Sequence, residues 1–176
     1  ELERETLSDD LKKVKALEIA GKAEKLYARW ESEWYEIQSI DIEELDRDLY
    51  NAESYIDKFN FKRADEVIMN SGELIASIKD RIASIRREIK ELKEVEPSNK
   101  ETYEEIVVEY KELNRELLAK RHQYGTAAEQ FETNIKNLAP QLEEFKVLTS
   151  TGKYIEAQEK INSIKESIYD LKERME

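Results

Sequence analysis

The 176-residue chain has 41 Asp and Glu against 29 Lys and Arg, which gives a formal net charge of -12 at pH 7. This charge would repel a polyphosphate backbone and argues against a nucleic-acid partner. Cysteine is absent and His122 is the single histidine, so thiol catalysis and the usual catalytic triads are excluded. Four scattered glycines cannot build a phosphate-binding loop. We therefore expect a non-enzymatic protein without a metal ion or cofactor.

A composition of 40% charged and 39% hydrophobic residues, with 4 Gly and 2 Pro, favours long amphipathic helices. No run approaches the length of about 20 apolar residues that a bilayer-spanning helix needs. The helical pattern is already running at Leu2 and is still running at Met175, so we expect the chain to be part of a longer protein. Helices are predicted at residues 2–20, 23–38, 42–58, 62–94, 101–138, 140–149 and 154–174.

The clearest periodic signal is an apolar heptad face, in steps of three and four residues, made by Ile75, Ile78, Ile82, Ile85, Ile89 and Leu92. We expect this helix to end before Pro97, because proline removes a backbone donor and disfavours helical geometry at Glu96. Ser98 and Glu101 fit a capping box that would start the next helix. That helix has its own apolar face: Tyr103, Ile106, Tyr110, Leu113 and Leu117.

An internal repeat aligns residues 61–66 with residues 154–159, an offset of 93 residues (154 − 61 = 93). Apolar positions agree in both directions from this match with little sequence identity, which indicates a shared packing scheme. We expect an all-α fold: an elongated rod of two spectrin-like antiparallel helical-bundle repeats that share long helices. The predicted repeats are residues 1–96 and residues 97–176, the second truncated at its C-terminal end.

Tyr27, Trp30, Trp34 and Ile37 fall on one helix face by their spacing. An aromatic core stripe is the preferred interpretation, with an exposed binding patch as the alternative. Adjacent acidic pairs such as Glu43 and Glu44 point about 100° apart on a helix, so we interpret them as solvated faces.

The densest basic cluster follows Leu117, where the apolar spacing would next place a core residue at Lys120. The simpler interpretation is that the aliphatic part of the Lys120 side chain passes along the edge of the core and keeps its ammonium group in water. The alternative is an electropositive contact for an acidic partner. Its candidate contact residues are Lys120, Arg121, His122 and Tyr124, and Gly125 weakens the helix just beyond them.

Four stretches, residues 21–30 with nearby Trp34, 57–64, 118–125 and 152–157, together resemble the septation ring regulator family EzrA of low-GC Gram-positive bacteria. The resemblance covers essentially the whole chain and matches the membrane-proximal part of that family's cytoplasmic region. It implies a protein anchored by an N-terminal transmembrane helix that this chain lacks, with a cytoplasmic rod of spectrin-like repeats.

The resemblance also implies a function in bacterial cell division. Such proteins bind the tubulin-like protein FtsZ, negatively regulate Z-ring assembly, and link the ring to the membrane and septal machinery. The expected location is the cytoplasmic face of the cell membrane at the division septum, and we expect this part to be soluble and monomeric. The alternative is a spectrin-like spacer or homodimerising coiled-coil scaffold that does not bind FtsZ.

Overall fold

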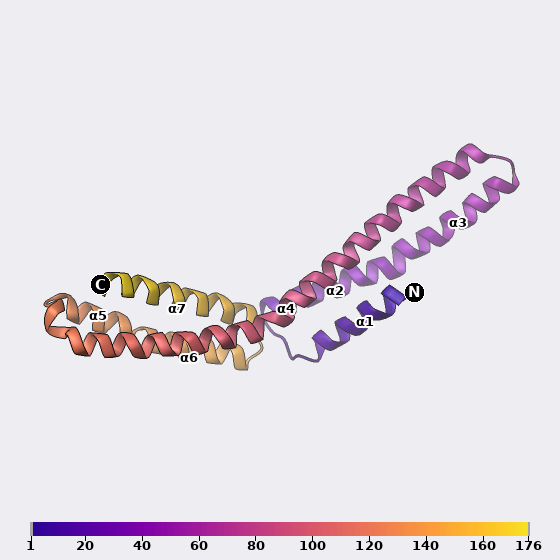
Figure 1. Ribbon diagram of the computed structural model, residues 1–176. Helices are drawn as coiled ribbons and strands as arrows, with labels where there is room; N and C mark the ends of the chain where they lie inside the picture. Colours follow the sequence, from indigo (N-terminus) through magenta and orange to yellow (C-terminus); the bar gives the residue numbers. More distant parts are fainter. Residues whose placement is uncertain (1, 176) are drawn as a thin grey trace. The chain divides into compact units, whose positions relative to one another are not determined.

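The computed structural model describes the backbone of residues 2–175 and the side chains of residues 7–175. All regular secondary structure in this part of the chain is helical, so the predicted all-α class with long helices is confirmed. In chain order the elements are α1 (Leu2–Lys15), α2 (Lys22–Glu36), the π-helical segment η1 (Ile37–Asp41), α3 (Ile42–Asp57), α4 (Phe61–Tyr124), α5 (Ala127–Lys136), α6 (Leu138–Ser150) and α7 (Tyr154–Met175) (Figure 1).

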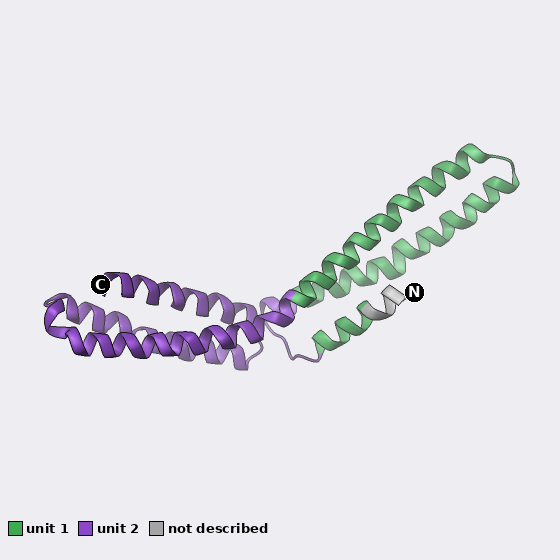
Figure 2. Ribbon diagram, in the orientation of Figure 1, with its two compact units in different colours: residues 1–15, 26–90 green, residues 16–25, 91–176 purple. Residues whose placement is uncertain are grey.

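The chain divides into two compact units (Figure 2). Unit 1 contains Glu1–Lys15 and Leu26–Lys90, and unit 2 contains Ala16–Lys25 and Glu91–Glu176. Helix α4 contributes its first part to unit 1 and its second part to unit 2. The expected division at residue 96 concerns sequence repeats, and it stays a prediction.

Unit 1 is held together by apolar side chains from α1, from α2 with η1, and from α4. Three of the four residues of the predicted aromatic stripe, Trp30, Trp34 and Ile37, are buried in the core, whereas Tyr27 is half-buried. The indole Nε1 of Trp30 also donates a hydrogen bond of 2.7 Å to the carboxylate of Glu88, which satisfies its one polar atom. The other large buried side chains of this core are Leu7, Leu11, Val14, Ile78, Ile82, Ile85 and Ile89. Ile75, predicted on the same heptad face, is instead 43% exposed.

The π-helical segment η1 joins α2 to α3 without a break, where the sequence predicted two separate helices. A π-bulge changes the phase of the following helix. Here it accompanies the burial of Asp41, which accepts a hydrogen bond of 2.6 Å from Arg81. The same guanidinium donates to Glu36 at 2.9 Å and to Glu33 at 3.1 Å, so three carboxylates converge on one cation.

Unit 2 has a continuous core between the second part of α4 and the helices α5, α6 and α7. Each fully buried Leu, Ile or Phe of this kind contributes about 1.5–3 kcal/mol. The core includes the predicted α4 face at Ile106, Leu113 and Leu117, with Tyr103 and Tyr110 partly buried against it. Its other main members are Phe131, Ile135, Leu138, Leu142, Phe145, Ile161, Ile164, Ile168, Leu171 and Met175.

The predicted helix end at Pro97 is wrong, because α4 continues through this residue, and Ser98 and Glu101 form no capping box. An interior proline costs roughly 3 kcal/mol and one backbone hydrogen bond. Tertiary contacts on both sides offset that cost: Leu92 and Asn99 are buried, and the Asn99 side chain donates to the backbone oxygen of Tyr154 at 2.9 Å.

The predicted helix at residues 101–138 is also wrong, because the chain turns after Tyr124. Gly125 adopts a φ of 54°, a left-handed conformation that glycine tolerates without a steric penalty. Helix α5 then begins at Ala127 and returns along α4. Residues 16–20, predicted as helix, lie beyond the end of α1.

The 93-residue offset reappears in the backbone of two helix–helix turns. Helix α3 ends at Asp57 and α6 at Ser150, and α4 begins at Phe61 and α7 at Tyr154, all 93 residues apart. The left-handed residues Phe59 and Gly152 also match, with φ of 59° and 74°. Each turn has the same pair of hydrogen bonds, typical of a Schellman motif: Asn60 to Tyr55 with Phe59 to Ile56, and Lys153 to Leu148 with Gly152 to Thr149.

Candidate interaction sites

The predicted contact residues lie together in the last turns of α4, within unit 2. Lys120, Arg121 and His122 are exposed, and Tyr124 is half-buried. The ammonium group of Lys120, which stands where the apolar spacing would place a core residue, pairs with Glu116 at 2.6 Å. The structure therefore presents three neighbouring basic side chains to solvent at one end of a helix.

Acidic neighbours partly neutralise this basic cluster. Arg121 lies 3.2 Å from a carboxylate oxygen of Glu132 on α5. A hydrogen bond from Lys136, followed by the charges of Lys136 and Arg121, lowers the pKa of Glu132. An approaching acidic group would compete with Glu132 for Arg121, so any contact here exchanges one ion pair for another.

Tyr124 packs mainly against the core of unit 2. Its ring packs edge-on against Phe131 with 5.3 Å between the ring centroids. Its hydroxyl oxygen is buried and has no hydrogen-bond partner among the described residues. The aromatic contact closes the turn between α4 and α5, so Tyr124 positions the basic cluster.

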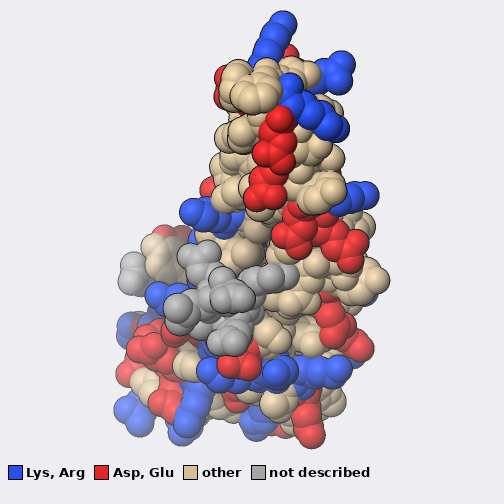
Figure 3. All heavy atoms as spheres, turned by 90° about the vertical axis from the view of Figure 1, so that its right-hand side faces the viewer, with Lys and Arg blue, Asp and Glu red and all other residues tan. Residues whose placement is uncertain are grey.

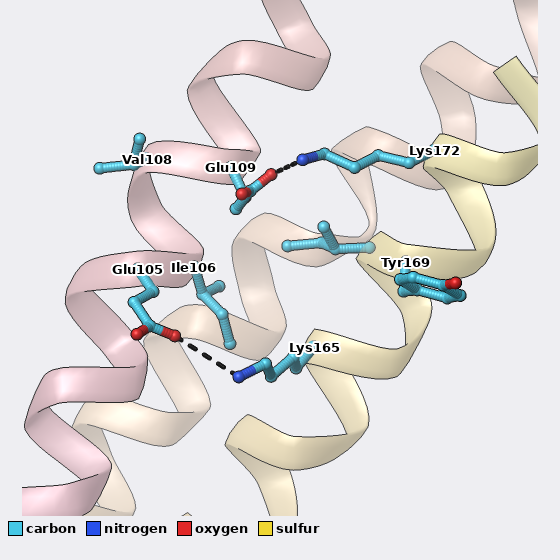
Figure 4. Close-up of a pocket in the computed structure, with 8 residues that line it drawn as sticks. Glu105, Ile106, Val108, Glu109, Lys165, Tyr169 and Lys172 are labelled. Carbon is cyan, nitrogen blue, oxygen red and sulfur yellow. Dashed lines mark hydrogen bonds and ion pairs between the residues drawn. The ribbon is translucent and has the colours of Figure 1, made fainter. Parts of the chain in front are cut away.

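A cleft of about 430 Å³ lies between α4 and α7 in unit 2 (Figure 4). Two ion pairs cross it, from Lys165 to Glu105 at 3.4 Å and from Lys172 to Glu109. Ile106 lies between them on α4 and belongs to the core. The cleft is therefore a groove along a helix–helix contact, bridged by charged side chains.

A second cleft, of about 600 Å³, lies between α4 and α6. The rings of Tyr103 and Phe145 stack at its base, with 5.2 Å between their centroids. Lys146 stands at the rim, where hydrogen bonds to Glu143 and then to Tyr103 raise its pKa. The walls of this cleft come from helices about 45 residues apart, so no local sequence pattern marks it.

Groups of three or more metal-ligating side chains in a suitable arrangement are absent from the residues that the structure describes. Within the same residues, every helix is too short or too polar to cross a membrane.

Comparison with known proteins gives a consistent result. The family model "Septation ring formation regulator, EzrA" matches residues 1–176. The septation ring formation regulator EzrA of Bacillus velezensis is 30% identical over 157 residues, covering 89% of this chain and 28% of the relative. The Staphylococcus epidermidis relative of the same name is 30% identical over 176 residues, covering all of this chain and 31% of the relative.

A Geobacillus relative of that name is 28% identical over 167 residues, covering 95% of this chain and 30% of the relative. This chain thus spans roughly three-tenths of the length of these relatives. Because the family match includes every residue, the chain belongs to the EzrA family of septation ring formation regulators.

Proposed function

We propose that this chain is part of a non-enzymatic regulator of bacterial cell division that binds FtsZ and negatively regulates Z-ring assembly. The observation that carries the proposal is the match of the whole chain to a family of septation ring formation regulators. Binding would weaken lateral or longitudinal contacts between FtsZ subunits, a steric effect that needs no catalytic residue.

The architecture proposed for this role is a rod of two spectrin-like repeats, residues 1–96 and 97–176. The two Schellman turns 93 residues apart support a tandem repeat, since both the helix ends and the turn hydrogen bonds coincide under that offset. Helix α4, 64 residues long, would pass from one repeat into the next, as expected for repeats that share helices.

The proposed contact with FtsZ is the basic cluster at the end of α4. Since the whole chain carries a net charge of -12, a local positive surface is needed to attract an acidic partner. Lys120 and Arg121 supply the exposed charge, His122 lies beside them, and Tyr124 fixes the turn.

The proposed location is the cytoplasmic face of the cell membrane at the division septum. An N-terminal transmembrane helix outside this chain would provide the anchor and link the Z-ring to the membrane and septal machinery. The chain itself would be monomeric, because the α4 heptad residues Ile78, Ile82, Ile85, Ile89 and Leu92, and the later Ile106, Leu113 and Leu117, are buried.

Co-sedimentation with FtsZ polymers formed in GTP tests the proposal. We expect the chain to enter the pellet, or to lower the amount of polymer in it, and Lys120→Glu with Arg121→Glu to reduce this effect at least fivefold. Lys12→Glu with Lys13→Glu, an adjacent basic pair exposed on α1, is the matched control and should act like the wild type.

Two results would contradict parts of the proposal. If the folded chain neither pelleted nor changed FtsZ assembly, it would be a spectrin-like spacer, which is the alternative function. If both double variants acted like the wild type, FtsZ binding would not depend on the α4 cluster. Sedimentation velocity of the chain alone checks the expected monomer.

A further inference from the structure

The α4–α6 cleft of unit 2 combines an apolar floor with two lysines at its rim. The buried ring of Phe145 and the half-buried ring of Tyr103 stack on each other there, and Pro97 adds a further apolar side chain. Lys100 lines the cleft from α4 and Lys146 lines it from α6. The volume of about 600 Å³ falls within the range typical of small-molecule sites, which also have mostly apolar walls and a few polar groups.

The pairing of the lysines distinguishes this cleft from the α4–α7 cleft. Across the α4–α7 cleft, Lys165 pairs with Glu105 and Lys172 with Glu109, so both cations are already neutralised. On the face of the molecule in Figure 3, Lys and Arg side chains likewise lie beside Asp and Glu. Lys100 is exposed, and its ammonium group has no ion pair or hydrogen bond among the described residues. The α4–α6 cleft therefore has a cation that is available to a ligand.

Lys146, the second cation of the rim, has only exposed partners. Its ammonium group pairs with Glu143, three residues earlier on α6, at 2.6 Å. The hydrogen bonds to Glu143 and Tyr103 raise the pKa of Lys146, so the group stays positively charged at neutral pH. An exposed ion pair contributes little to stability, because water solvates both ions well. An acidic ligand can therefore share Lys146 with Glu143.

The internal repeat shows that this chemistry is not a general consequence of how the hairpins pack. Under the 93-residue offset, Phe145 corresponds to Ala52 and Lys146 to Glu53. Helix α3 therefore has neither the aromatic ring nor the cation at the equivalent positions. The aromatic floor and the basic rim of the α4–α6 cleft are specific to unit 2.

We propose that the α4–α6 cleft binds a small aromatic acid. The aromatic body lies on the rings of Tyr103 and Phe145, where binding removes apolar surface from water. The acidic group pairs with Lys100 and Lys146. Glu96, the acidic residue of the cleft lining, lies one helical turn before Lys100 and repels an acid at that end. This site is separate from the FtsZ contact proposed at the end of α4.

The test uses anilinonaphthalene sulfonate as the probe, because it combines an aromatic body with one acidic group. Titration with the whole chain is followed by the fluorescence of the probe, which rises when its rings leave water. The salt concentration is about 150 mM, where screening limits nonspecific charge effects. We expect saturable one-to-one binding. Anilinonaphthalene without the sulfonate has the same aromatic body and serves as the uncharged companion probe.

Two double variants with the same change in charge place the site. Lys100→Glu with Lys146→Glu should raise the Kd of the sulfonate at least tenfold and leave the Kd of the uncharged probe unchanged. Lys111→Glu with Arg115→Glu, on α4 outside the cleft, should leave both Kd values unchanged. All four side chains are exposed, so circular dichroism should show unchanged helix content. Tyr103→Leu removes one of the stacked rings and should weaken the binding of both probes.

Three outcomes would overturn the proposal. The first is no saturable binding of the sulfonate to the folded wild-type chain. The second is an equal loss of binding in both double variants, which would indicate a general charge effect. The third is an equal weakening of both probes by Lys100→Glu with Lys146→Glu, because the lysines would then not select for the acid. Each result is independent of FtsZ sedimentation, so failure here leaves the proposed function standing.

Discussion

Phe59 holds a left-handed backbone conformation, with a φ of 59°, at the turn between α3 and α4. Its ring is 81% exposed and contacts Phe61 edge-on, with 6.2 Å between the ring centroids. A residue with a Cβ atom pays roughly 1–2 kcal/mol in this region relative to right-handed conformations. The matching turn has Gly152, so the strain at Phe59 comes from the side chain and not from the turn.

Replacing Phe59 tests this strain. We expect Phe59→Gly to be more stable than Phe59→Ala by about 1 kcal/mol, because both lose the ring and only glycine relieves the steric clash. Urea unfolding followed by tryptophan fluorescence reports on unit 1, where Trp30 and Trp34 lie. Equal midpoints for the two variants would show that Phe59 is unstrained.

Gly152 is the reciprocal control. A Cβ atom there would lie 2.2 Å from the backbone oxygen of Glu18, and the φ of 74° is itself unfavourable for alanine. We expect Gly152→Ala to destabilise unit 2 by about 1–3 kcal/mol, measured by urea unfolding with circular dichroism. A neutral result would mean that residues 16–20 can move away from the turn at no cost.

Arg81 is the residue on which the polar part of unit 1 depends. Partial burial acts to lower its pKa, but the hydrogen bond to Glu33 and the charges of Asp41, Glu36 and Glu33 outweigh burial and raise it. The guanidinium therefore stays charged, and three carboxylates share it. Removing the cation would leave Asp41, which is 9% exposed, without its charge partner.

We expect Arg81→Met to destabilise unit 1 by about 2 kcal/mol, since losing one partner leaves the desolvation cost of the other uncompensated. Asp41→Asn added to Arg81→Met should recover part of this loss. The unfolding midpoint from tryptophan fluorescence measures both changes. Lys120→Ala, which breaks an exposed pair, should cost within about 0.5 kcal/mol.

Helix α4 is the element in which a local rule gave the wrong answer. Pro97 predicts a helix end from sequence, and its cost is fixed by covalent geometry. That cost is smaller than the stabilisation from two packed units, whose cores include the α4 side chains on either side of Pro97. A long helix can therefore contain a proline when its flanking turns are anchored by tertiary contacts.

Pro97→Ala should raise the free energy of unfolding by about 1–3 kcal/mol, because it restores a backbone hydrogen bond and removes the ring clash. Circular dichroism during urea unfolding gives the change, with Glu94→Ala as an exposed control in the same helix. A loss of stability would instead mean that packing of the Pro97 ring in the α4–α6 cleft stabilises the fold by more than the missing hydrogen bond and the ring clash destabilise the helix.

At the scale of the whole chain, the two hairpins that correspond in the 93-residue repeat differ in how deeply their apolar side chains are buried. Ile161 in unit 2 is 1% exposed, and its counterpart Ile68 in unit 1 is 50% exposed. The side chains are identical and occupy corresponding positions in the 93-residue repeat, so the comparison tests how much burial contributes to stability.

We expect Ile161→Ala to cost about 2–5 kcal/mol through lost burial and a residual cavity. Ile68→Ala should cost less than about 1 kcal/mol, because half of the side chain is already in water. Urea unfolding by circular dichroism compares them directly. Similar costs would show that Ile68 is covered in solution, for example by a second copy.

The sequence by itself determined the helical class, the repeat offset, the aromatic core of α2 and the apolar faces of α4, because these follow from local periodicity and composition. Only the tertiary structure decided that α4 passes through Pro97, that Gly125 ends it, and that Ile75 is exposed. Each of these depends on packing against segments distant in the sequence, and a local sequence pattern does not contain that information. The basic cluster was visible as a run of residues, whereas its neutralisation by Glu132 required the α4–α5 turn.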